Sequence, residues 1–264
     1  MAFDWKDKRV LVTGASSGIG KGLALRLASL GARVGICARR EAELSAVLTK
    51  CQATSPDSAM WLCDMAIPEE VDLLVNGVNE SFGGIDVLVN NAGIPKRKHI
   101  LQTDQAMVEN VMRVNFLAPT QLTFGLLPGM VERNEGRIIN VSSVAATLSS
   151  PGEAAYDASK AALAVFSEAM AVDLWDRGIK VMVVYPGVVD TPLFDLPDNN
   201  PLPASAPAKI TVDEMVDAIL AGVDEDAVEV YAPQWFKDIA VGKAQNTKGF
   251  IEGAAAWLRD TQQT

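Results

Sequence analysis

Short runs of consecutive apolar residues alternate along the chain with longer segments in which apolar residues recur at helical spacing. Runs that are apolar at nearly every position are typical of strands covered on both faces, as in a parallel sheet. The strands expected on this basis are residues 10–12, 34–37, 60–63, 87–89, 138–141 and 181–184, with a seventh at 228–231.

Helix-length segments, such as residues 21–30 and 155–176, lie between these runs. Regular alternation of strand and helix favours right-handed crossovers and predicts an α/β fold with a doubly wound, seven-stranded parallel sheet. The chain has 264 residues, 49% of them hydrophobic, which is enough for one sizeable core. We therefore expect a single domain over residues 1–264.

One segment breaks the alternation. Residues 191–210 contain five prolines, at 192, 197, 201, 203 and 207. Proline disfavours both helix interiors and central strands, so the segment is predicted to be a long loop. Because it follows a strand end, a lid over a substrate is favoured over a floppy insertion.

The C-terminal segment, residues 234–264, carries apolar residues on a helical background. It predicts a helical extension of one or two amphipathic helices that pack on the body or on a partner subunit. Attachment to a membrane surface is disfavoured, because the flanks are only mildly basic. The apolar residues are Trp235, Phe236, Ile239, Phe250, Ile251, Trp257 and Leu258.

Composition narrows the classes of function. A formal net charge of −10 argues against nucleic-acid binding, which needs a basic face. The three cysteines, Cys37, Cys51 and Cys63, lack metal-ligand spacing and resemble small buried residues in a reducing compartment, so no metal site is expected. The start of the chain is too polar for a signal peptide, and no run approaches the roughly 20 apolar residues of a spanning helix. A cytoplasmic protein is expected.

A glycine motif follows the first expected strand and opens the first helix. Residues 13–20 read Thr-Gly-Ala-Ser-Ser-Gly-Ile-Gly, and strand, glycine turn and helix start is the context of a dinucleotide site. The three glycines are expected to allow a sharp turn, close approach to a pyrophosphate and tight packing of helix on strand. The helix N-terminus then faces the anion. The cofactor contacts expected here are Gly14, Ser16, Ser17, Gly18, Ile19 and Gly20.

The end of the second strand indicates which dinucleotide binds. An NAD site would place an acidic residue there, whereas this chain has Ala38-Arg39-Arg40. Guanidinium groups suit a 2′-phosphate, so NADP(H) is the predicted cofactor. Arg39 is the favoured contact, and Arg40 is expected mainly to solvate a helix start. Asp64, after the third strand, either accepts from the adenine amino group or caps the next turn.

Together with Asn90-Asn91-Ala92-Gly93, Asn115, Ser143, Tyr156-Asp157-Ala158-Ser159-Lys160 and Pro186-Gly187, the glycine motif resembles the pattern of the short-chain dehydrogenase/reductase family. The resemblance runs from about residue 8 to residue 232. It implies a Rossmann-type fold, an oxidoreductase acting on a carbonyl or alcohol, and a homodimer or homotetramer formed through helices near residues 103–134 and 155–177.

The resemblance also implies a catalytic group of Asn115, Ser143, Tyr156 and Lys160. Ser143 rather than Ser142 stands at the family's distance from the tyrosine. Tyr156 and Lys160 are four residues apart on an expected helix and share one face. An ammonium about 4 Å from the phenol, at an effective dielectric of roughly 20, is expected to lower the tyrosine pKa by roughly three units. Asn115 would hold a water that connects Lys160 to solvent.

By the same resemblance, two further turns contact the nucleotide. Asn91, Ala92 and Gly93 would support the sheet and meet the adenosine ribose. After the sixth strand, Pro186, Gly187, Val189 and Thr191 would hold the nicotinamide side.

The substrate is less clearly indicated. Lid residues Leu193, Phe194, Leu196 and Leu202 favour a hydrophobic ketone, aldehyde or secondary alcohol. Lys96-Arg97-Lys98-His99 either attracts an anionic group or, as short basic runs usually do, forms a solvated loop, which is the favoured interpretation. Two alternatives are a non-catalytic NADP-binding regulator or scaffold of the same fold and an epimerase or lyase with a tightly held nucleotide.

Overall fold

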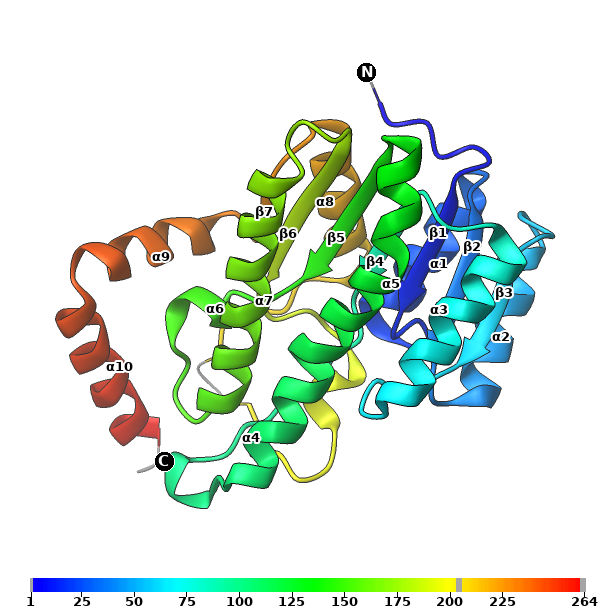
Figure 1. Cartoon of the computed structure of the whole chain (residues 1–264). Helices are drawn as coiled ribbons and strands as arrows, with labels where there is room; N and C mark the ends of the chain where they lie inside the picture. The colour runs from blue at the N-terminus through cyan, green and yellow to red at the C-terminus, as the bar shows by residue number, and fades with distance from the viewer. Residues whose placement is uncertain (1, 203–205, 262–264) are drawn as a thin grey trace.

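The computed structural model describes residues 2–202 and 206–261. Within them, the apolar runs form one seven-stranded parallel sheet with the order β3-β2-β1-β4-β5-β6-β7 (Figure 1). The doubly wound sheet predicted from the sequence is confirmed. The strands are β1 (Arg9–Thr13), β2 (Arg33–Ala38), β3 (Ala59–Leu62), β4 (Val87–Asn90), β5 (Gly136–Val141), β6 (Ile179–Pro186) and β7 (Glu229–Ala232).

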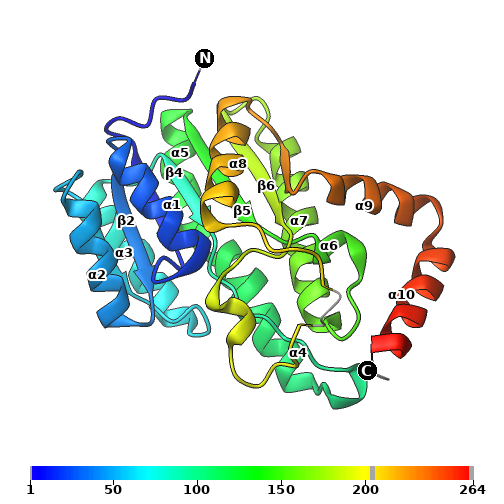
Figure 2. The same ribbon diagram turned by 180° about the vertical axis from the view of Figure 1, so that it is seen from behind.

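Helices cover both faces of the sheet. Figure 1 shows α3 (Pro68–Phe82), α5 (Ala118–Arg133) and α7 (Ala154–Asp173) on one face. Figure 2 shows α1 (Gly18–Ser29), α2 (Glu41–Gln52) and α8 (Val212–Asp224) on the other. The shorter elements are η1 (Ile100–Gln102), α4 (Gln105–Met112), the π-helical turn η2 (Arg113–Leu117), α6 (Ala145–Leu148) and η3 (Pro192–Asp195).

The strands contribute side chains to apolar cores on both faces of the sheet. Val10 and Val12 of β1 pack with α1 and α8, whereas Leu11 between them packs with α3 and α5. Successive side chains of a strand point to opposite faces, so a strand covered on both sides is apolar at most of its positions. This requirement explains the continuous apolar runs that mark the strands in the sequence.

The segment after β6 forms a closed loop. Val189 pairs with Ile210, the Asp190 N–H donates to the Ile210 carbonyl at 2.8 Å, and the Ile210 N–H donates to the Val188 carbonyl at 2.9 Å. Between these ends, the described residues form η3 and irregular backbone. We call residues 191–210 the lid loop; its Pro203 lies outside the described residues.

The C-terminal segment forms two helices, α9 (Trp235–Gln245) and α10 (Thr247–Thr261), which Figures 1 and 2 show extending beyond the sheet. Phe236 is buried, and a Cβ added to Gly187 would lie 2.4 Å from its ring. Lys243 donates to the Thr147 carbonyl at 2.6 Å and to Ser149 Oγ at 2.7 Å, which fixes α9 to α6.

All three cysteines are buried and unpaired. Burial raises the pKa of the Cys51 thiol to about 11 and that of Cys63 to about 12. None of the helices in the described part of the chain combines the length and apolarity needed to cross a bilayer.

Candidate active site

A cleft of about 650 Å³ lies at the carboxyl edge of the sheet, between the lid loop, α10 and the loops that follow the strands. Loops at this edge of a doubly wound sheet are the usual place for a nucleotide. The cleft gathers most of the residues singled out in the sequence, whereas Gly20 and Asn115 do not line it. Those that line it are Gly14, Ser16, Ser17, Gly18, Ile19, Arg39, Arg40, Asp64, Asn91, Ala92, Gly93, Ser143, Tyr156, Lys160, Pro186, Gly187, Val189 and Thr191.

The glycine turn packs directly against the turn after β4. Gly14 has a φ of +68°, and a Cβ there would lie 2.8 Å from the Ala92 Cα. A Cβ on Gly20 would lie 2.5 Å from Asn91 Nδ2. Thr13 Oγ1 accepts from the N–H groups of both Asn91 and Ala92 at 2.9 Å. A side chain at either glycine would therefore separate the two turns that form this end of the cleft.

Arg40 reaches across the glycine turn. Its Nη2 donates to Ser16 Oγ at 2.9 Å and to Ser17 Oγ at 2.8 Å. Arg39 instead lies with its Nη1 3.7 Å from Asp64 Oδ2. Arg40 also lies at the start of α2, as expected, with its Nη1 3.6 Å from Glu43 Oε1. Its contacts with the two serines are an addition to that role, because the fold brings them within reach of its guanidinium.

Asp64 caps the turn that follows β3. Its Oδ1 accepts from the Ala66 N–H at 2.9 Å, which corresponds to the second of the two roles considered from the sequence. It also lines the cleft beside Arg39.

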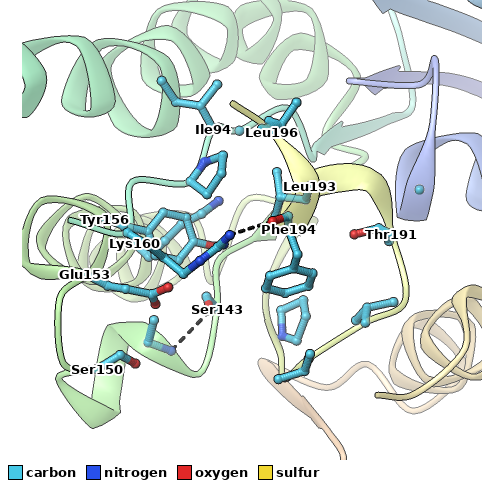
Figure 3. A pocket seen from close by; sticks show the side chains of 18 of the residues that line it. Ile94, Ser143, Ser150, Glu153, Tyr156, Lys160, Thr191, Leu193, Phe194 and Leu196 are labelled. Carbon is cyan, nitrogen blue, oxygen red and sulfur yellow. Dashed lines mark hydrogen bonds between the residues drawn. The ribbon is translucent and has the colours of Figure 1, made fainter. Parts of the chain in front are cut away.

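Tyr156 and Lys160 lie on one face of α7, as their spacing predicts, and Figure 3 shows both at the cleft wall. Lys160 Nζ donates to the Val141 carbonyl at 2.8 Å and lies 5.8 Å from the centroid of the Tyr156 ring. Ser142 Oγ donates to the Lys160 carbonyl at 2.8 Å. Ser142 thus holds α7 against β5. Both Ser142 and Ser143 line the cleft.

Asn115 lies behind the cleft, fully buried in the π-helical turn η2. Such turns often mark functional sites. Its Oδ1 accepts from the Ile94 N–H at 2.8 Å, and its Nδ2 donates to the Ile94 carbonyl at 2.9 Å and to Ser159 Oγ at 3.0 Å. A Cβ on Gly93 would lie 3.2 Å from Asn115 Oδ1 and 3.3 Å from Lys160 Nζ, so both side chains approach this glycine.

The turn after β6 is placed opposite the glycine turn. Val189 is buried, and a Cβ on Gly18 would lie 3.1 Å from Thr191 Cγ2. Apolar side chains continue this wall from the lid loop (Leu193, Phe194, Leu196, Leu202) and from α10 (Phe250, Ala254, Trp257, Leu258).

The protonation behaviour of Tyr156 differs from the sequence expectation. Burial, followed by the negative charge of Glu153, raises the pKa of Tyr156, whereas a hydrogen bond with Ser143 lowers it. Burial also lowers the pKa of Lys160 to about 8. The expected lowering of the tyrosine pKa by the lysine is therefore wrong for the protein chain alone. The ammonium is turned to a backbone carbonyl, and burial weakens its own charge.

Two acidic residues beside Tyr156 were not anticipated. Burial raises the pKa of Glu153 to about 7, against the opposing charge of Arg97. Burial and then Glu153 raise the pKa of Asp157 to about 8. At the start of a helix, carboxylates are ordinary first-turn residues, so the sequence carried no signal for their burial.

The basic segment, residues 96–98, is not the solvated loop expected from the sequence. Lys96 Nζ lies 2.9 Å from Asp198 Oδ2, and Lys98 pairs with the other oxygen of the same carboxylate. Arg97 is only 5% exposed. The segment is ordered because the lid loop supplies a carboxylate and carbonyl groups to it. His99 remains exposed and accepts from the Leu101 N–H, in line with a role in the loop.

Comparison with known proteins gives a consistent result. The family model described as short chain dehydrogenase matches residues 8–200. A 3-oxoacyl-(acyl-carrier-protein) reductase of Vibrio cholerae is 35% identical over 186 residues, which cover 70% of this chain and 75% of the reductase. Several other curated relatives are longer, and the chain covers 58–66% of their length.

Two solved structures show how widely the fold is shared. A short-chain dehydrogenase from Sphingobium yanoikuyae in complex with NADPH is 28% identical, with a TM-score of 0.81 over 92% of this chain and 95% of that one. A short-chain dehydrogenase/reductase from Burkholderia phymatum in complex with NAD is 22% identical, with a TM-score of 0.84 over 93% and 96%. At that identity the second likeness concerns the fold alone.

The pKa of Glu153 predicts how stability depends on pH. Because the folded-state pKa of about 7 exceeds the ordinary 4.5, the folded chain binds this proton more tightly than the unfolded chain does. The stability associated with it is present at low pH and is lost as the pH rises from about 4.5 to about 7. Relative to wild type, Glu153→Gln should gain up to about 3 kcal/mol of unfolding free energy across this window. Urea unfolding at a series of pH values measures the difference.

Exposed Glu132→Gln is the matched control and should change stability by less than about 0.5 kcal/mol at every pH. A difference between Glu153→Gln and wild type that stays constant across the pH window would contradict the raised pKa.

Proposed function

The chain belongs to the short-chain dehydrogenase family, and on this basis and the geometry of the cleft we propose that it is an NADP(H)-dependent oxidoreductase that interconverts a ketone or aldehyde and the corresponding alcohol. The observation that carries the proposal is the convergence of three side chains on one cleft. Tyr156 and Ser143 face its interior, with Lys160 one helical turn beyond the tyrosine, and the same cleft continues to the glycine turn (Figure 3).

Each of these side chains has a role in the proposed reaction. The bound nucleotide supplies a hydride to the carbonyl carbon. The Tyr156 hydroxyl donates its proton to the carbonyl oxygen, so that hydride and proton together convert C=O into CH–OH. The Ser143 hydroxyl donates a hydrogen bond to the same oxygen and stabilises the negative charge that develops there. In the reverse direction, the phenolate accepts the alcohol proton.

The raised pKa of Tyr156 suits carbonyl reduction, because the phenol is then protonated at neutral pH and ready to donate. After donation, the phenolate needs a proton and a nearby positive charge. While it is protonated, Lys160 stabilises the phenolate with its positive charge. Its pKa of about 8 also lets it pass on a proton near neutral pH, after which the amine is neutral and needs a new proton. Asn115 and Lys160 both approach Gly93, which supports a role for Asn115 in a proton path toward solvent.

The residues at the end of β2 support NADP(H). Arg39 and Arg40 both line the cleft beside the glycine turn, and Ser16 and Ser17 add hydroxyl groups at the same place. Guanidinium and hydroxyl donors suit the 2′-phosphate that distinguishes NADP from NAD. The strand itself ends in Ala38, which offers no carboxylate to a ribose hydroxyl.

A substrate with an apolar substituent fits the opposite end of the cleft. The lid loop and α10 supply its wall there, with Leu193, Phe194 and Leu196 from the loop and Phe250 and Ala254 from the helix. The lid-loop residues lie near the end of the family match at residue 200, and α10 lies beyond it. The substrate range is therefore expected to be characteristic of this chain.

We also propose that the chain forms a homo-oligomer through α5 and α7. Phe124 of α5 is 61% exposed, and Val165 and Val172 of α7 are 65% and 75% exposed. Exposed apolar side chains concentrated on neighbouring helices typically mark an interface. The comparisons give no support to the non-catalytic alternative, since they name reductases and dehydrogenases.

Tyr156→Phe tests the catalytic proposal. Removing the proton donor should lower the turnover number by about a thousandfold or more, while the affinity for NADPH changes by less than about threefold. Loss of NADPH absorbance over a panel of ketones and aldehydes measures the first, and fluorescence titration measures the second. The control is Tyr185→Phe, which removes a buried phenol bonded to Glu168 outside the cleft and should leave turnover nearly unchanged. Full turnover by Tyr156→Phe would refute the assignment.

Arg40→Ala tests the choice of cofactor. Loss of a charge-assisted contact with a phosphate should weaken NADPH binding about 10- to 100-fold and NADH binding by less than about threefold. Dissociation constants for both nucleotides measure the effect. Arg26→Ala, which removes an exposed ion pair between α1 and α8, should change neither. An equal loss for the two nucleotides would mean that Arg40 only organises the glycine turn.

The assembly is tested by placing charges on α5 and α7. Light scattering should give wild type twice or four times the mass of one chain, and the double variant Phe124→Asp/Val165→Asp should dissociate to single chains. Leu73→Asp, at an equally exposed position on α3, should leave the assembly intact. A monomeric wild-type protein would exclude the interface.

A further inference from the structure

Arg97 is a buried cation whose hydrogen bonding is incomplete. Its Nε donates to the Asn200 carbonyl at 2.8 Å and its Nη2 to the Phe194 carbonyl at 2.6 Å; the latter is the dashed line beside Phe194 in Figure 3. Its Nη1 is buried and has no hydrogen-bond partner. A buried donor without an acceptor is costly, and more so when it carries charge.

The cleft lies beside this guanidinium. Arg97 lines it, and its charge acts on both Glu153 and Tyr156. Figure 3 places Glu153, Tyr156 and Ser143 around the same part of the cleft, with Leu193 and Phe194 across from them. Arg97 therefore lies at the end of the cleft where the substrate is proposed to react.

The positive charge of Arg97 is also not neutralised by an ion pair. Asp198, the acidic residue of the lid loop nearest the basic segment, is taken by Lys96 and Lys98. Glu153 forms no ion pair with Arg97 among the described residues, and burial raises its pKa to about 7, so it is partly protonated at neutral pH. An anionic ligand would supply the missing acceptor and the missing counter-charge together.

A role confined to holding the lid loop would not need this group. The two contacts with the carbonyl groups of the loop use Nε and Nη2, and Nη1 takes no part in them. A planar guanidinium is well suited to bind a carboxylate. Ile94, Leu193 and Phe194, which line the same cleft, are apolar, and a charge pair is stronger where water is excluded.

We propose that Arg97 Nη1 binds a carboxylate carried by the substrate, so that the substrates are oxo acids and the corresponding hydroxy acids with an apolar substituent. This inference rests on the proposed function and adds the chemical class to it. Arg97 also accepts from the Asn200 N–H at 2.8 Å, and its own N–H donates to Asn199 Oδ1 at 2.8 Å. The residue that recognises the anion is thus the one that fastens the lid loop.

The test compares acids with their neutral esters. The probes are 2-oxo-4-phenylbutanoate and 4-oxo-4-phenylbutanoate, each with its methyl ester, reduced with NADPH. For at least one pair, wild type should have a kcat/KM at least about tenfold higher for the acid. Arg97→Met should lower the value for that acid about 10- to 100-fold and that for its ester by less than about threefold.

The ratio of acid to ester separates recognition from damage to the lid loop. Lys98→Met removes one of the two lysines that hold Asp198, so it should change acid and ester by the same factor. Arg97→Lys keeps the charge and should retain part of the preference for the acid. Equal turnover of acid and ester by wild type, or an equal loss of both in Arg97→Met, would overturn the inference.

The two proposals fail in different ways. Tyr156-dependent turnover of neutral ketones without any preference for acids would leave the proposed function standing and remove the inference. If wild type reduced no carbonyl at all, the proposed function would fall. Calorimetric titration of the NADP-loaded protein would then decide the inference. It requires 4-phenylbutanoate to bind at least about tenfold more tightly than 4-phenylbutanamide to wild type. This preference should be absent in Arg97→Met.

Discussion

Two hydrogen bonds between β5 and α7 fix the geometry on which the cleft depends. Ser142 Oγ donates to the Lys160 carbonyl, and Lys160 Nζ donates to the Val141 carbonyl, each at 2.8 Å. They join the end of a central strand to the second turn of the helix that carries Tyr156. Ser143 directly follows Ser142 in the chain. The hydrogen bond of Ser142 to α7 therefore also fixes the position of Ser143 relative to the Tyr156 phenol. The site is thus built on rigid elements, which is how precise geometry is held.

Burial governs the charges that this arrangement brings together. It raises the pKa of Tyr156, Glu153 and Asp157 and lowers that of Lys160, so each group is moved toward its neutral form. Arg97 adds a guanidinium to the lining of the same cleft. The basic segment thereby acquires two functions in the structure: its lysines hold the lid loop, and its arginine keeps a fixed charge inside the cleft.

Much of this architecture could be predicted from the sequence, and the remainder shows where such reasoning ends. The strands were predictable because burial on both faces leaves continuous apolar runs, and the glycine turn because its spacing is local. Arg97 and Glu153 were not, since their burial depends on a loop a hundred residues away and on a helix start that looks ordinary. The role of Arg40 was underestimated for the same reason: Ser16 and Ser17 come within reach only after β1 and β2 have paired. The roles of the catalytic group remain predictions supported by their convergence.

The pairing of Val189 with Ile210 has a consequence for how such a protein can diversify. The two ends of the intervening segment are hydrogen-bonded to each other, and these bonds help to offset the conformational entropy lost on closing the loop. That entropy loss grows only slowly with the length of the loop. Replacing the segment between Val189 and Ile210 would change the lining of the cleft while leaving the strands of the sheet in place. Selection, or an engineer transplanting cassettes between homologues, could then retune which molecules are accepted without refolding the scaffold.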